Sequence, residues 1–131
     1  MIAQEELPMV AIPSMNDTHL EESLLVNKLE SSAKDNDIEA TLATLKELLE
    51  HTTLHFSKEE NIMKESSFFE YNSHKAEHDR HLSELQSIIE YFDERRDPNA
   101  ILAYINGNLK AWMIDHIKTM DTVMAKHAQS S

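Results

Sequence analysis

The stretch LATLKELLEHTTLHFSKEENIM, residues 42–63, has the spacing of a long amphipathic helix. Leu42, Leu45 and Leu48 follow one another at helical intervals of three residues, Leu49 follows Leu45 by four, and Ile62 is a further apolar residue near the end of the stretch. His51, His55 and Glu59 follow one another at intervals of four residues. Residues four apart in a helix are separated by about 40° around the axis and about 6 Å along it, so His55 and Glu59 project together.

The composition favours a single all-helical domain. The chain has 131 residues, of which 40% are hydrophobic, and this suits one core. One glycine and three prolines are far fewer than the turns of a β-rich fold need. The net charge of -12 repels nucleic-acid phosphates and anionic lipids, so neither nucleic acid nor a membrane is an expected partner. Because cysteine is absent, any bound metal must have nitrogen and oxygen ligands.

The apolar pattern predicts four long helices. They are expected over residues 17–33, 38–64, 70–92 and 99–126. Asp97 can cap the fourth helix, with Pro98 at its first position. The connectors are short, and helices joined in this way pack as an up-down-up-down antiparallel four-helix bundle. We assign residues 17–131 to this bundle.

The first 16 residues are expected to form an extended N-terminal arm, because they contain Pro8 and Pro13 and have no helical period. Asn16, Asp17 and Thr18 each suit the N-cap of the helix that follows. The arm has no basic segment followed by an apolar core, and no apolar run in the chain approaches the roughly 20 residues that span a bilayer. A cytoplasmic protein is therefore expected.

Histidine occurs on the inward side of every predicted helix. The motif HKAEH on the third helix repeats the four-residue spacing of the second. The inward polar set is His19, His55, Glu59, His74, His78 and His116. A single such pair arises by chance on many helices, and a lone inward histidine is commonly a hydrogen-bonded core residue. Burying the whole set without a shared partner would be strongly destabilising, so the pattern predicts a metal site.

The order of these motifs resembles the hemerythrin family across nearly the whole chain. A histidine on the first helix is followed by HFSKEE, HKAEH and HIKTMD on the next three. The resemblance implies a non-haem centre of two iron ions with an oxo or hydroxo bridge. The ligands that it implies are His74, His78 and His116 on one iron, His19 and His55 on the other, and Glu59 and Asp121 as bridging carboxylates.

Asp121 is the one implied ligand that helix periodicity does not support. It follows His116 by five residues, which is about 140° around an ideal helix. Its bridging role therefore rests on the resemblance and predicts that either the side chains of His116 and Asp121 straddle the core or the helix distorts locally between Ile117 and Asp121. The residue types alone leave iron, manganese and zinc open.

The resemblance also implies a ligand site. Two nitrogen ligands on one ion, against three on the other, leave an open position for a small molecule, and similar proteins bind O2 there reversibly inside an apolar pocket. The candidates for its lining are Phe56, Trp112, Met113 and Ile117, of which Met113 replaces a leucine usual in the family. Plain core packing is an alternative role for all four.

Two further polar residues leave a second function open. His81 continues the row of His74 and His78, at a position where similar proteins commonly have phenylalanine. Glu22 lies three residues after His19, on nearly the same face. Each either points outward, supports a ligand by a hydrogen bond, binds the metal, or donates protons.

The function classes are therefore an O2-binding protein for storage, delivery or sensing, and a diiron oxidase or peroxidase acting on O2 or peroxide. A metal-free interaction bundle would leave the inward histidines unexplained. The sequence leaves the oligomeric state open.

Overall fold

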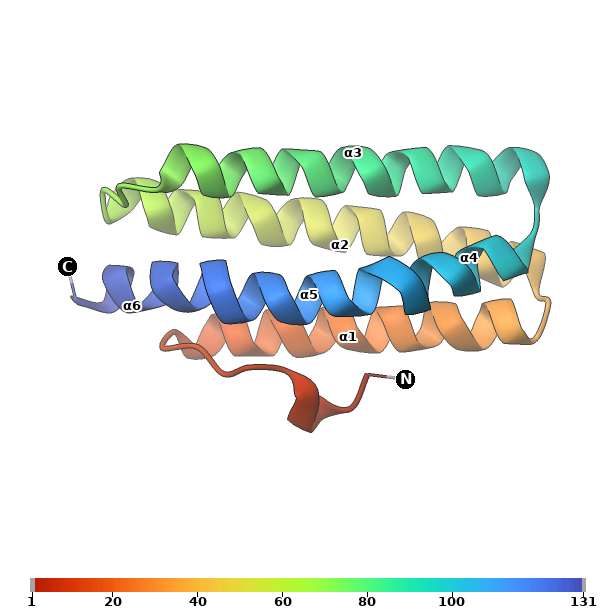
Figure 1. Ribbon diagram of the computed structural model, residues 1–131, viewed down its shortest axis with the longest axis horizontal. Coiled ribbons are helices and arrows are strands. Elements are labelled where there is room, and N and C mark those ends of the chain that lie inside the picture. The colour runs from red at the N-terminus through yellow and green to blue at the C-terminus, as the bar shows by residue number, and fades with distance from the viewer. Residues whose placement is uncertain (1, 131) are drawn as a thin grey trace.

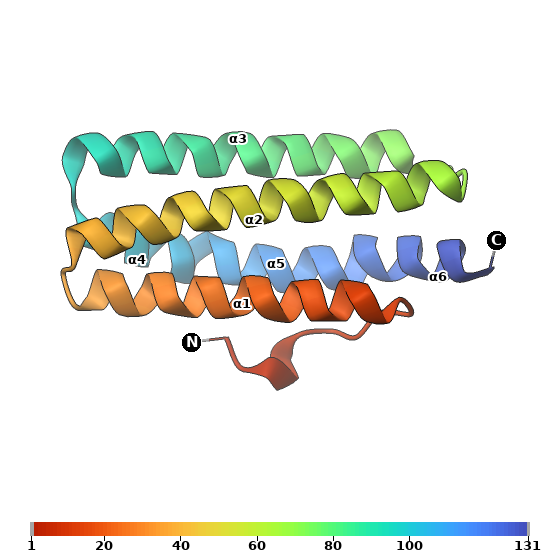
Figure 2. The same ribbon diagram turned by 180° about the vertical axis from the view of Figure 1, so that it is seen from behind.

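The computed structural model describes residues 2–130, and within that range every regular element is a helix. Four helical rods lie side by side: α1 (Pro13–Lys34), α2 (Ile38–Glu65), α3 (Tyr71–Arg95) and a segmented fourth rod (Figure 1). Successive rods run in opposite directions in both views (Figure 2), so the predicted all-α antiparallel bundle is confirmed. The predicted domain bounds also include Met1 and Ser131, which lie outside the described residues. No helix within residues 2–130 is long and apolar enough to cross a bilayer.

The fourth rod is one continuous helix with two wider turns. It runs through α4 (Pro98–Tyr104), the π-helical turn η2 (Ile105–Leu109), α5 (Lys110–His116), a second π-helical turn η3 (Ile117–Asp121) and α6 (Thr122–Ser130). The residues at its junctions keep right-handed helical φ and ψ angles, so the rod is unbroken. Asp97 caps its start by accepting a hydrogen bond of 3.0 Å from the Asn99 N–H, as predicted.

The first helix begins at Pro13, four residues before the predicted start at Asp17. Proline suits the first helical position because no N–H donor is needed there. Asn16 lies inside the helix, and its side chain bonds the backbone N–H and carbonyl of Val10 at 2.8 and 3.0 Å. Asp17 and Thr18 also lie inside the helix, so the three predicted N-caps are wrong.

The arm before Pro13 runs back along α1 (Figure 1). It contains a short 3-10 helix, η1 (Gln4–Glu6), which the prediction of an extended arm missed. Asn27 of α1 holds the start of the arm, because its side chain accepts from the Ile2 N–H at 2.8 Å and donates to the Ile2 carbonyl at 2.9 Å. Ile2 is buried as a result.

Each of the three connections between rods contains a residue in the left-handed region. Asn36, Ser67 and Arg96 have φ angles of 55°, 53° and 53°. This conformation costs most residues other than glycine about 1–2 kcal/mol, and asparagine tolerates it best. The one glycine of the chain, Gly107, lies instead within η2. The turns are therefore fixed by the packing of the rods and keep some backbone strain.

The apolar core is divided into two clusters. The larger one lies toward the α1–α2 and α3–α4 turns and includes Val26, Leu29, Leu45, Leu48, Leu85, Ile89, Phe92, Ile101, Ile105 and Leu109. The smaller one lies toward the α2–α3 turn and includes Met15, Met63, Phe68, Ile117 and Met124. In sequence, each rod contributes polar residues between its contributions to the two clusters, so a polar layer lies between them.

We expect Arg96→Gly to stabilise the protein by about 1 kcal/mol, because glycine adopts a positive φ without the clash of a Cβ atom. Arg95→Gly is the matched control. Arg95 is the last residue of α3, where glycine should cost about 0.5–1 kcal/mol. Denaturant titration of both variants measures the two free energies of unfolding. Destabilisation of the same size in both variants would contradict the strain assigned to Arg96.

Candidate metal centre

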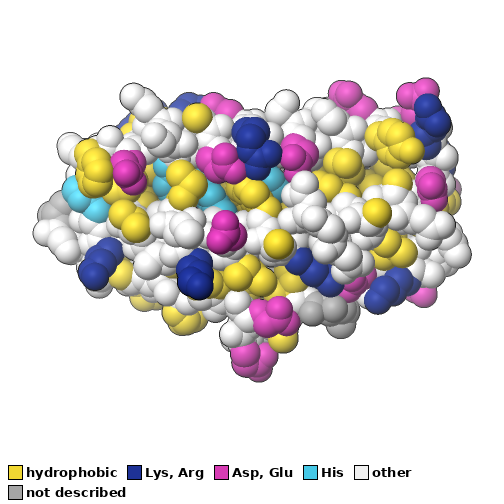
Figure 3. Space-filling model, in the orientation of Figure 1, with side chains coloured by type: hydrophobic (Ala, Val, Ile, Leu, Met, Phe, Trp, Pro, Cys, Tyr) yellow, Lys and Arg dark blue, Asp and Glu magenta, His cyan; other side chains and the backbone are white. Residues whose placement is uncertain are grey.

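Seven buried side chains from the four rods meet in the polar layer. They are His19 from α1, His55 and Glu59 from α2, His74 and His78 from α3, and His116 and Asp121 from the fourth rod. None of them is more than 6% exposed. In the space-filling view, histidine shows only as small patches between the surface side chains (Figure 3). The structure therefore brings all seven predicted ligands together.

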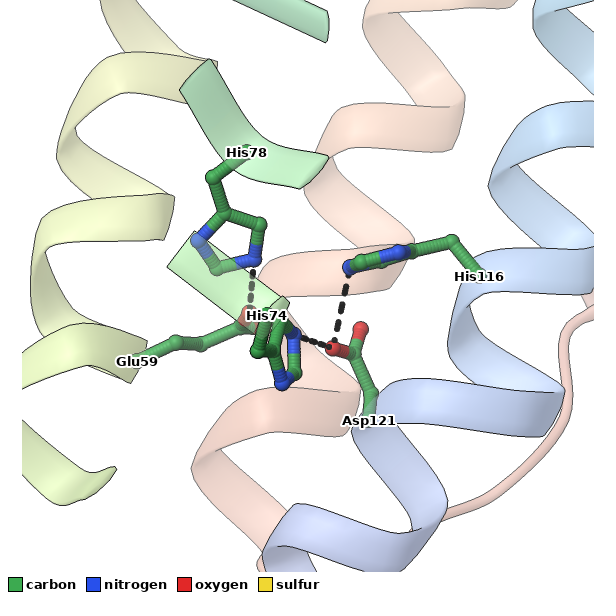
Figure 4. A group of neighbouring side chains, drawn as sticks. All are labelled: Glu59, His74, His78, His116 and Asp121. Atoms are coloured by element: carbon green, nitrogen blue, oxygen red, sulfur yellow. Dashed lines mark hydrogen bonds and ion pairs between the residues drawn. The ribbon is translucent and has the colours of Figure 1, made fainter. Parts of the chain in front are cut away.

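These side chains form two overlapping groups, in each of which the nitrogen and oxygen atoms lie within 4.8 Å of one another. The first group contains Glu59, His74, His78, His116 and Asp121 (Figure 4). The second contains His19, His55, Glu59 and Asp121. Only the two carboxylates belong to both groups, so the imidazoles divide three to two.

Glu59 directs its two oxygens toward different groups. Oε1 lies 3.2 Å from Nε2 of His78, which belongs to the group of three imidazoles. Oε2 lies 2.6 Å from Nε2 of His55 and 3.5 Å from Nε2 of His19. The carboxylate therefore spans the distance between the two sets of imidazoles.

Asp121 also contacts both sets of imidazoles, from the opposite side of the polar layer. Its Oδ1 lies 3.0 Å from Nε2 of His74 and 3.3 Å from Nε2 of His116, whereas its Oδ2 lies 3.1 Å from Nε2 of His19. The wider turn η3 makes this contact with His116 feasible, because a π turn accommodates one extra residue before the chain returns to the same face. The predicted distortion between Ile117 and Asp121 is confirmed.

The residues present fit metal ions. In the described chain, ring nitrogens or carboxylate oxygens without a hydrogen-bond partner are buried at His19, Glu59, His74, His78, His116 and Asp121. Leaving such an atom unsatisfied costs about 1–3 kcal/mol, so seven side chains would not be gathered here for packing alone. Imidazole and carboxylate donors with converging atoms suit first-row transition metals.

In the metal-free chain, protons balance the charge of the carboxylates. Burial alone would lower the pKa of His19, but hydrogen bonds to Asp121 and Glu59 outweigh it and raise that pKa to about 9. Burial would raise the pKa of Asp121, but hydrogen bonds from His116, His19 and His74 hold it well below its usual range. Metal binding should therefore release protons from the imidazoles.

Two of the imidazoles are also held by their outer nitrogens. His55 Nδ1–H donates to Oε2 of Glu22 at 2.6 Å, and His78 Nδ1–H donates to Oε2 of Glu60 at 3.0 Å. Both bonds leave Nε2 directed at the carboxylates of the centre. Sequence reasoning considered Glu22 and missed Glu60, whose one signal is its position next to Glu59. Its partner on α3 can be identified only once the two helices are paired.

A small internal cavity of about 10 Å³ adjoins the group of two imidazoles. Its lining residues are His19, Glu22, His55, Phe56, Trp112, Met113, His116, Ile117 and Asp121. All four predicted pocket residues are among them, and His74 and His78 are not. The volume is near the lower limit for one water molecule, so only a very small ligand fits. Glu22 is the one polar lining residue that is not among the seven predicted ligands.

The family comparison matches this geometry. The Hemerythrin HHE cation binding domain matches residues 11–128. The chain belongs to the hemerythrin family. Hemerythrins bind a diiron centre, and the two groups of side chains described above could hold its metals.

Individual hemerythrins extend the likeness over most of the chain. A bacteriohemerythrin from Aquifex aeolicus (strain VF5) is 29% identical over 112 residues, which cover 86% of each protein. A myohemerythrin from Sipunculus nudus is 37% identical over 82 residues, covering 63% of this chain and 61% of its own. A crystal structure of a hemerythrin mutant superposes with a TM-score of 0.83 over 98% of this chain and 95% of that one, at 20% identity. This last likeness supports the fold.

His81 lies inside the bundle but outside the cavity. It is 1% exposed, and its ring stacks on Trp112 with centroids 3.7 Å apart and planes at 2°. Trp112 in turn stacks on His116 at 4.7 Å and 12°, so the indole contacts both His81 and the predicted ligand His116. The Nδ1 of His81 is buried without a hydrogen-bond partner, and burial lowers the pKa of His81 to about 4. His81 therefore does not face a ligand in the cavity directly.

We expect His81→Phe to make the metal-free protein less sensitive to acid. The neutral form of His81 is favoured in the folded state, so its contribution to stability is complete above pH 6.5 and is lost as the pH falls toward 4. At about 1.4 kcal/mol per pKa unit, the free energy of unfolding of the variant should gain about 3 kcal/mol on wild type over this range. Denaturant titrations between pH 7.5 and 4 measure the difference. A difference that is constant with pH would contradict the prediction.

Proposed function

We propose that this hemerythrin holds two irons and binds O2 at the one coordinated by His19 and His55. His74, His78 and His116 hold the other iron, and Glu59 and Asp121 bridge the pair. The observation that carries the proposal is that Glu59 and Asp121 each direct one carboxylate oxygen to each set of imidazoles. A bound diiron centre supplies an open coordination position and the electrons that bind a small oxygen species.

The cavity supports the choice of iron and ligand. It adjoins His19 and His55, the set with fewer nitrogen donors, and it leaves room only for a very small ligand. Phe56, Met113 and Ile117 are buried around it and exclude water. Trp112 also lines it and is held by a hydrogen bond of 2.8 Å from its Nε1–H to Glu77. Storage, delivery and sensing of O2 all need these properties.

A diiron oxidase or peroxidase is the second candidate function. The observation that favours it is Glu22, a buried carboxylate that lines the cavity beside four predicted ligands and four apolar residues. Its two oxygens are already bonded to Thr52 and His55, so it supports the metal centre through His55 and is not placed as a ligand itself. His81 is separated from the cavity by Trp112, so proton delivery from it would require a water or a movement of the indole.

We expect the metal content of variants to separate bridging from terminal ligands. Glu59→Ala and Asp121→Ala each remove one oxygen ligand from each of the two irons, so both irons should be lost. His19→Ala removes one nitrogen from one iron, so about one of the two irons should remain after mild chelation, because the other keeps its three imidazoles. Metal analysis with circular dichroism of each variant makes the measurement. Equal iron loss in all three would contradict the bridging assignment.

We expect the reduced, iron-loaded protein to develop a visible absorption band on exposure to O2. If the band disappears on removal of O2 and returns on its addition, reversible binding is supported. Direct conversion to the oxidised form, with peroxide or water as product, supports the oxidase class. His55→Ala is the control, since it removes a donor from the iron beside the cavity. Zinc in place of iron, or no metal, would refute the proposed function.

A further inference from the structure

Glu22 is not a predicted metal ligand, but it directly contacts one, His55. Of the non-ligand carboxylates with such a contact, it is the most completely buried. It is 3% exposed on α1. Its Oε2 accepts the hydrogen bond of 2.6 Å from His55 Nδ1–H, and its Oε1 accepts one of 2.8 Å from the Thr52 hydroxyl. Both partners lie on α2. Glu22 therefore holds His55 by the nitrogen that faces away from the metal centre.

The charge of Glu22 is poorly screened. Among the described residues, its ion-pair partner is His55 itself. Both oxygens of Glu22 accept hydrogen bonds, one from His55 Nδ1–H and one from the Thr52 hydroxyl, and such bonds favour the ionised carboxylate. A charge at a buried site interacts several times more strongly with its neighbours than the same charge in water.

We propose that Glu22 is a positioning residue that fixes the orientation of His55 and, through its negative charge, lowers the reduction potential of the metal centre. The inference rests on the proposed function, since it requires a redox-active metal on His55. A carboxylate that accepts the Nδ1 proton increases the electron density at Nε2. This electron density stabilises the more positive, oxidised metal more than it stabilises the reduced metal, and the reduction potential falls as a result.

A lower reduction potential would change the balance between reversible ligand binding and oxidation of the centre. A lower potential makes electron transfer to a bound oxygen species more favourable and its return less favourable. Because Glu22 also lines the cavity, its charge acts on the ligand side of the centre. The residue therefore favours lasting oxidation of the centre over reversible carriage of O2.

The chain offers a matched control in Glu60. Its Oε2 accepts from His78 Nδ1–H at 3.0 Å, so the two carboxylates have the same chemical role on different imidazoles. The Glu60 side chain is 17% exposed, however, and Lys75 lies 3.8 Å from its Oε1. Solvent and a neighbouring cation should therefore reduce its effect on the centre.

The experiment compares Glu22→Gln with Glu60→Gln in the iron-loaded protein by reductive titration at fixed pH. Glutamine keeps the size of the side chain and removes its charge. Glu22→Gln should change the equilibrium with a one-electron reductant about tenfold toward the reduced form, or about 59 mV, and Glu60→Gln should change it less. Thr52→Val keeps the carboxylate but removes one of its donors, so the free charge should strengthen the bond to His55 and move the potential the opposite way.

A second measurement uses the metal-free protein. The Nδ1 proton of His55, observed by nitrogen-edited NMR, should move upfield in Glu22→Gln as the short bond to a charged acceptor is lost. Glu22→Asp keeps the charge and should retain part of the downfield shift. It should also keep the potential nearer to wild type than Glu22→Gln does, which a loss of packing alone would not produce.

The outcomes separate this inference from the proposed function. Wild-type protein without redox-active iron overturns both. Iron-loaded wild type in which Glu22→Gln leaves the potential unchanged, or moves it no further than Glu60→Gln does, overturns the inference alone. If Glu22→Gln fails to retain iron, the sign of the Thr52→Val shift decides, and a shift toward the reduced form overturns the inference.

Discussion

Two carboxylates and five imidazoles are buried in the centre of this bundle, and hydrogen bonds within the described chain do not satisfy all of their polar atoms. A shared cation is the simplest partner for such a set, because it accepts all of the nitrogen and oxygen donors together. The rest of the fold is arranged around this requirement. One apolar cluster lies on each side of the polar layer, and these clusters supply the hydrophobic stabilisation that the layer does not.

The two carboxylates that contact both sets of imidazoles, Glu59 and Asp121, reach the polar layer by different helical geometries. Glu59 follows His55 by four residues on regular helix, and the long glutamate side chain reaches both sets of imidazoles. Asp121 follows His116 by five residues and has a shorter side chain, so its helix must widen to bring both residues onto one face. The π turn is therefore a functional adjustment, and the near-ideal φ and ψ angles on either side confine it to one turn.

The bundle and the meeting of the seven candidate ligands could be predicted because each depends on spacing within one helix or on a family pattern. The start of α1 could not, since Pro13 reads equally as part of an arm and as a first helical residue. Contacts between helices were also out of reach. The bonds from Thr52 to Glu22 and from His78 to Glu60 depend on the relative rotation of neighbouring rods, which the sequence pattern leaves undetermined. The same applies to the stack of His81 on Trp112, which places His81 outside the cavity.

The cavity combines two properties with opposite effects on a ligand. Its apolar wall excludes water and so limits the proton supply, which favours release of an unchanged ligand. The buried negative charge of Glu22 repels an incoming anion. It also favours electron transfer from the centre to a neutral ligand. The charge of Glu22 by itself therefore disfavours a small anion relative to a neutral ligand of the same size. Because the cavity is near the lower size limit for one water molecule, charge and size both restrict which ligand can lie beside His19 and His55.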